Sequence, residues 1–248
     1  MAEWFVQSTF ITFFGTGGFL LGAWLAAWLK EIPGLSLGWV YAVSSGILSG
    51  MIILELIPEA FAQFPVHFLL TGFLLGLYFI RFIHRFLSRL IIFTPRHDWL
   101  SIESVSIFFI GISLHNLPIG ISLGFQLNNA SHLSIPWVAA LIFHHIPEGL
   151  ALFSMLAAQG IRFPRMVLLS LLLSLSLGLG TGLGFIADFS TSVIIALSMG
   201  ISIALLIYIA WFDMAVKAKQ TLPGKHLLIG FGSGSIACSI IMSFMHFH

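Results

Sequence analysis

Long apolar stretches, separated by short breaks, run along nearly the whole chain and restrict what it can fold into. Of its 248 residues 58% are hydrophobic, and only 8% carry a charged side chain. A soluble domain has roughly 25% charged residues, because its surface faces water. This composition therefore excludes a soluble globular protein, and we expect the surface of the protein to face the lipid bilayer.

Charge and cysteine content exclude further classes of protein. The formal net charge is +1, so the chain offers no broad basic face for nucleic acid. A single cysteine, Cys238, excludes both a disulfide framework and a cysteine-rich zinc module.

The apolar stretches predict helices, since they are long and lack the alternating polarity of barrel strands. A helical span needs about 20 mostly apolar residues. We therefore expect an all-α polytopic membrane protein with one transmembrane domain, residues 1–248, because the connections are too short for a soluble domain. Its eight transmembrane helices are expected at about 5–29, 36–62, 66–83, 103–127, 133–158, 165–187, 190–214 and 226–246.

Lysine and arginine predict the orientation of these helices. All ten fall in or beside four alternate connections, which by the positive-inside rule are cytoplasmic. Both termini are then expected outside the cytoplasm. The ten are Lys30, Arg81, Arg85, Arg89, Arg96, Arg162, Arg165, Lys217, Lys219 and Lys225.

Glycine pairs at a spacing of four occur in several expected helices, as in Gly18/Gly22, Gly46/Gly50 and the run from Gly178 to Gly184. Small residues at this spacing let membrane helices approach closely. We expect helix packing at these positions.

Four acidic residues fall within the expected spans: Glu55, Glu59, Glu148 and Asp213. A charged group at this depth costs about 2.5–3.5 kcal/mol on insertion scales and indicates function. No lysine or arginine is expected deep enough to pair with them. The pattern favours a cationic ligand, protonation or access of water.

Two copies of a His-x-x-Pro-x-Gly motif lie near the middle of the fourth and fifth spans. They read HNLPIG from His115 and HHIPEG from His144, 29 residues later. His144 and Glu148 are four residues apart and share a helical face. Each proline, Pro118 or Pro147, also frees a backbone carbonyl one turn earlier. Imidazole and carboxylate donors suit divalent transition metals, and the lack of thiolates argues against copper(I).

These motifs resemble those of the ZIP family of divalent metal transporters. The eight spans and the segment LELIPEAF from Leu54 are also similar to that family. The resemblance implies a metal site between spans four and five, and two helix groups that move against each other. By this resemblance, His115, His144 and Glu148 match the family's first metal position. Asn116 and Glu148 match part of its second metal position.

The chain also departs from the family pattern. Ile119 replaces the glutamate of the fourth span, and the sixth span has no acid between Ser174 and Phe185. Two neutral imidazoles and one carboxylate leave a site charge of −1 against a +2 ion. The site could be completed by His145, Asn116, water or an acid such as Glu59. We therefore expect one bound metal ion and not two.

The expected function is transport of a divalent metal, zinc first and iron or manganese next, toward the cytoplasm across the cell membrane. Asn116 and His145 would be auxiliary ligands or proton carriers. Glu59 would shape the pathway, as could Asp213, which lies near a family acid of the seventh span. No enzymatic activity is expected, and a homodimer is left open.

Two other functions compete with transport. A degenerate relative acting as a metal sensor or scaffold is favoured by Ile119 and the acid-free sixth span. A membrane-embedded metal hydrolase could use the same ligands with a bound water, but the chain lacks a His-Glu-x-x-His motif.

Overall fold

The structure is a computed structural model, and it describes residues 3–32, 36–90, 96–129, 135–158, 160–186 and 193–246. Within these ranges all elements are helical, and helices lie at all eight expected segments. They are α1 (Glu3–Lys30), α2 (Leu37–Met51), η1 (Ile52–Leu56), α3 (Ile57–Gln63), α4 (Val66–Leu90), α5 (Arg96–Asn129), α6 (Ile135–Ala158), α7 (Phe163–Ile186), α8 (Val193–Ile207), η2 (Tyr208–Met214), α9 (Ala215–Thr221) and α10 (Gly224–His246).

Five helical segments are long and apolar enough to cross a membrane: Glu3–Leu29, Leu37–Gln63, Val105–Asn128, Phe163–Ile186 and Val193–Thr221. Shorter apolar helices cover Val66–Phe82 and Leu141–Ala157. Large apolar side chains point outward, with Phe13 71% and Leu228 73% exposed. Buried positions include polar groups such as Ser45 and Asn116. An apolar surface around polar interior positions fits a lipid environment.

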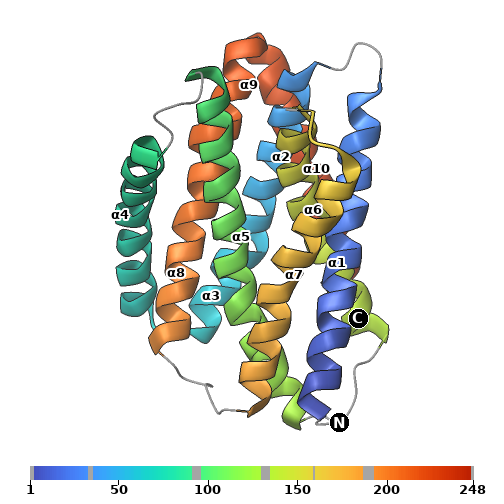
Figure 1. Cartoon of the computed structure of the whole chain (residues 1–248), viewed down its shortest axis with the longest axis vertical. Coiled ribbons are helices and arrows are strands. Elements are labelled where there is room, and N and C mark those ends of the chain that lie inside the picture. The colour runs from blue at the N-terminus through green and yellow to red at the C-terminus, as the bar shows by residue number, and fades with distance from the viewer. Residues whose placement is uncertain are drawn as a thin grey trace.

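The helices run roughly along the long axis of the molecule (Figure 1). Helix α1 packs against α6 and α7, and α5 also packs against α7. Helix α2 pairs with α10, while α4 pairs with α8 at the edge of the bundle (Figure 1). The α5/α8 contact joins the helices α1, α5, α6 and α7 to the α4/α8 pair.

Glycine lies in each of these close helix pairs, as the sequence predicts. A Cβ atom on Gly22 of α1 would lie 2.5 Å from the carbonyl oxygen of Ile146 on α6. A Cβ atom on Gly180 of α7 would meet the carbonyl oxygen of Leu117 and the Cα atom of Gly120 on α5. The prediction of close packing at glycine is confirmed.

Two π-helical turns, which the sequence does not predict, interrupt the second and seventh helical segments. The η2 turn is held against α2 by side chains of α2: the Ser45 hydroxyl donates to the carbonyl of Ala210 (2.7 Å). The Trp211 indole N–H of η2 donates to the Ser49 hydroxyl of α2 (2.8 Å). Turns of this kind occur frequently at functional sites.

Proline ends two of the helical segments sharply. Phe64 and Leu222 adopt extended backbone angles, and each precedes a proline, Pro65 or Pro223. A residue before proline is driven out of the helical region by contact with the proline ring. The chain therefore reverses at these points with only two residues outside a helix.

Replacing Gly180 by alanine should destabilise the α5/α7 contact. The added methyl group meets backbone atoms that cannot rotate away, so we expect a loss of about 1–3 kcal/mol. Thermal unfolding of the purified protein in detergent measures this loss. In the matched variant Gly232→Ala on α10, the new Cβ meets no atom within 4 Å, and stability should stay the same or rise. Equal melting temperatures for the wild type and Gly180→Ala would contradict the packing.

Candidate metal site

Two imidazoles and one carboxylate converge between α5 and α6. His115 comes from α5, while His144 and Glu148 lie one turn apart on α6. The Nε2 atoms of His115 and His144 are 3.3 Å apart, and Nε2 of His115 is 3.6 Å from Oε1 of Glu148. One ligand atom from each residue lies within 4.8 Å of the other two.

These separations are close to those of ligands on one metal ion. With Zn–N bonds of about 2.0–2.1 Å in tetrahedral geometry, neighbouring ligand atoms lie about 3.3 Å apart. The His115–His144 distance equals this value, and the His115–Glu148 distance is slightly longer. Two of the three separations thus lie near the value for ligands of one ion.

The Glu148 carboxylate is fully buried. Among the described residues, no hydrogen-bond partner reaches either of its oxygens, and none reaches Nδ1 of His115. An ionised carboxylate is costly to bury unless it is paired or bound to a metal. A bound cation would offset this cost.

Asn116 and His145, the expected auxiliary ligands, are also fully buried beside this group. The Asn116 amide donates to the carbonyl of Leu173 on α7 (3.4 Å), and its Oδ1 makes no hydrogen bond to a described residue. The His145 ring donates from Nδ1 to the Leu141 carbonyl (2.7 Å) and packs edge-on against Phe19. His145 lies next to His144 but outside the set of three converging ligand atoms.

Glu55 lies at the site, although the sequence marked it only as an acid within a span and did not assign it to the site. Its Oε1 lies 3.0 Å from Nδ1 of His144, and the two side chains are 15% and 12% exposed. Glu55 sits in the η1 turn, on a helix distant in sequence from α6. The sequence signal was its acidity within an apolar span, and only packing shows which acid faces the imidazoles.

Glu59, which the sequence favoured instead, lies in α3 and is exposed. Its Oε1 accepts a hydrogen bond from the Gln63 amide (2.9 Å). A π-helical turn changes the angular register of the helix, so the α-helical spacing between Glu55 and Glu59 does not hold here. The structure does not bring Glu59 into the group formed by His115, His144 and Glu148.

Asp213 lies in η2, and Oδ2 of its carboxylate accepts a hydrogen bond from Lys217 Nζ at 2.9 Å. The expectation that no lysine or arginine reaches the acids of the spans is therefore wrong for Asp213. The reason is the spacing of four along one helix, which lets the long lysine side chain reach back one turn.

Ile119, where the ZIP pattern has a glutamate, packs against an apolar cluster that includes Ile11, Leu123 and Leu177. Helix α7, which faces α5 there, contains no acidic residue. Neither Ile119 nor α7 therefore supplies a carboxylate on this side of the site.

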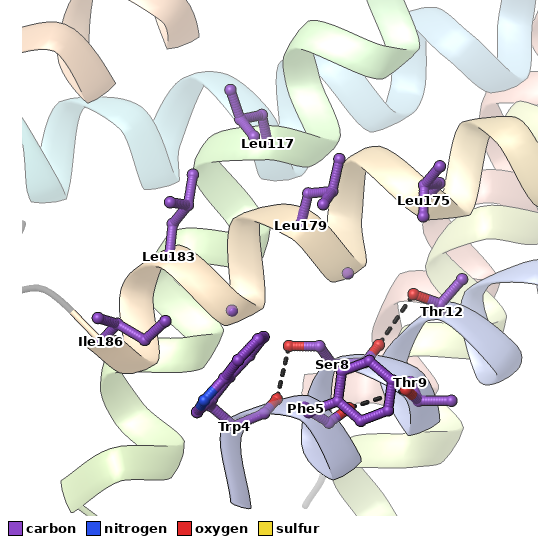
Figure 2. A pocket seen from close by; sticks show the side chains of 12 residues that line it. Trp4, Phe5, Ser8, Thr9, Thr12, Leu117, Leu175, Leu179, Leu183 and Ile186 are labelled. Carbon is purple, nitrogen blue, oxygen red and sulfur yellow. Dashed lines mark hydrogen bonds between the residues drawn. The ribbon is translucent and has the colours of Figure 1, made fainter. Parts of the chain in front are cut away.

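A separate pocket of about 580 Å³ lies between α1 and α7 (Figure 2). The hydroxyls of Ser8 and Thr12 that line it donate to carbonyls one turn back on α1, at 2.7 and 2.8 Å. Trp4, Leu179 and Leu183 supply much of the remaining wall. With its hydroxyls bound to the helix backbone, this apolar pocket has no ligand set for a cation.

Comparison with known proteins places the site within a family. No curated protein matches the chain. The family model described as ZIP zinc transporter matches residues 97–244, more than half of the chain, and that range contains both histidine motifs. The chain belongs to the ZIP zinc transporter family.

Proposed function

We propose that this membrane protein transports a divalent transition metal ion through a site formed by His115, His144 and Glu148. The observation that carries the proposal is the buried Glu148 carboxylate, which lies beside two imidazoles and has no hydrogen bond within the described part of the chain. ZIP family members transport metal ions, so the cation that this site would hold is the substrate. No step of this proposal requires an enzymatic reaction.

Zinc is the proposed substrate, with iron(II) and manganese(II) as the next candidates. Nitrogen and oxygen ligands suit these ions. Asn116 and His145 are proposed auxiliary groups, because Oδ1 of Asn116 and Nε2 of His145 are buried without a hydrogen bond to a described residue. Glu59 and Asp213 are proposed to act along the pathway and not at the site itself.

We further propose that residues 1–248 form one transmembrane domain of eight spans in the cell membrane, with both termini outside the cytoplasm. Helices at all eight expected segments support the count. Helix α1 begins at the lower end in Figure 1, while α9 lies at the upper end. Helix α1 ends at Lys30, and α9 contains Lys217 and Lys219, so the end of α1 and helix α9 share one end of the molecule. That end would face the cytoplasm, toward which the metal would move.

One metal ion per chain is proposed. A second ion would need further carboxylates, and Ile119 and the acid-free helix α7 remove them from this side of the site. A single ion with few charged ligands can also leave again, which transport requires.

A second candidate function is a metal sensor or scaffold that binds the ion without moving it. The packing of Ile119 into an apolar cluster favours this alternative, because a family carboxylate is absent there. A sensor or scaffold would use the same metal site as a transporter. It would differ only in that no ion crosses the membrane.

Zinc uptake into proteoliposomes should depend on Glu148. We expect Glu148→Gln to abolish saturable uptake, because the neutral amide removes the charge that holds the ion, and His144→Ala to act in the same direction. Radioactive zinc measures the flux. Glu31→Gln, which removes an exposed carboxylate from the turn after α1, is the matched control and should transport like the wild type. Undiminished uptake by Glu148→Gln would refute its role as a ligand.

Calorimetric titration of the purified protein with zinc should give one tight site per chain. The expectation rests on the ligand set, which provides carboxylates for only one ion. Glu148→Gln should lose this site. Two tight ions per wild-type chain would show that the proposed stoichiometry is wrong.

Introducing the missing acid separates the two candidate functions. Ile119→Glu places a carboxylate one turn from His115. If the natural protein is a transporter, zinc uptake should already be measurable in the wild type and should change only in rate. Flux that appears only in Ile119→Glu would instead establish a sensor or scaffold.

A further inference from the structure

We propose that Glu55 is the positioning residue of this metal site: it fixes His144 for metal binding and supplies the second negative charge of the site. The proposal rests on the function proposed above and names a residue from outside the two histidine motifs. It starts from the 3.0 Å contact between Glu55 Oε1 and His144 Nδ1.

The contact determines which nitrogen of His144 can bind a metal. An ionised carboxylate only accepts hydrogen bonds, so Nδ1 of His144 carries the proton and donates it to Glu55. In the neutral ring, Nε2 then has the free lone pair. That atom is the one facing Nε2 of His115, 3.3 Å away. Glu55 therefore points the metal-binding nitrogen of His144 toward the other ligands, as outer carboxylates do for metal-bound histidines.

Glu55 also balances the charge of the bound ion. Two neutral imidazoles and Glu148 give the site a charge of −1, which leaves a divalent ion half compensated. Adding the Glu55 carboxylate brings the total to −2 and makes the loaded site neutral. Uncompensated charge is costly in a buried site, so Glu55 takes over the electrostatic role that Ile119 cannot fill.

The position of Glu55 depends on packing between different helix pairs. Helix α2, which continues into η1, pairs with α10, where a Cβ atom on Gly46 would meet the carbonyl of Phe231. Helix α6 packs against α1 and also contacts α2. The Glu55–His144 hydrogen bond thus joins two helix pairs, and the site has its second carboxylate only when these pairs are in the observed register.

Cobalt(II) titration of the purified full-length protein, followed by its visible absorption, tests the proposal. Glu55→Ala removes both the hydrogen bond and the charge, and we expect affinity to fall 10–100-fold, as for other outer-shell partners of metal ligands. Glu55→Gln keeps an oxygen acceptor for Nδ1 and removes only the charge, so its affinity should lie between those of the wild type and Glu55→Ala. Glu31→Gln should bind cobalt like the wild type.

A double-mutant cycle with His144→Ala tests whether Glu55 acts through His144. Removing Glu55 should cost less affinity when His144 is already absent, because the hydrogen bond is then gone and only the charge of Glu55 still acts. A purely structural role would give the same loss in both backgrounds, and that result would overturn the proposal. So would wild-type affinity in Glu55→Ala. If the wild type itself binds no cobalt or zinc, the proposed function fails. If the wild type binds and Glu55 variants are unaffected, only this inference fails.

Discussion

Close approach of helix backbones at glycine is the contact on which the rest of this structure depends. Lipid provides no hydrophobic force that drives helices together, so packing has to come from shape. The pairs α1/α6 and α5/α7 meet where Gly22 and Gly180 let one backbone touch another. Because α1 also packs on α7, these four helices form a connected group. That group brings His115 of α5 next to His144 and Glu148 of α6.

Burying polar side chains inside this helix group costs free energy, and that cost points to a ligand-binding role. Glu148 is buried without a hydrogen bond from the described residues, and His115 keeps an unsatisfied ring nitrogen. Neither arrangement stabilises the empty fold. Both are explained if the site spends part of its time loaded with a divalent cation.

The replacement of the family glutamate by Ile119 is understandable once Glu55 is considered. The isoleucine extends an apolar cluster that includes residues of α1, α5 and α7, while the Glu55 carboxylate on η1 lies 3.0 Å from Nδ1 of His144. A charge carried by η1 differs from one carried by α5, because α2, which continues into η1, packs on α10 as well as on α6. Any displacement of α6 against α2 would therefore change the charge around the ion.

The sequence by itself determined the membrane class, the positions of the helices and the three side chains that converge in the buried group of His115, His144 and Glu148. These follow from local properties: apolar length, the spacing of four between His144 and Glu148, and the repeated His-x-x-Pro motif. It also predicted glycine packing, since small residues have one main use in such helices. Only the tertiary structure decided that Glu55, and not Glu59, faces His144, and that Asp213 pairs with Lys217. The first choice depends on a π-helical turn, which changes the register of the helix and has no signature in residue spacing. Which face of α2 meets α6 is likewise set by contacts between helices far apart in the chain, and no local pattern encodes those.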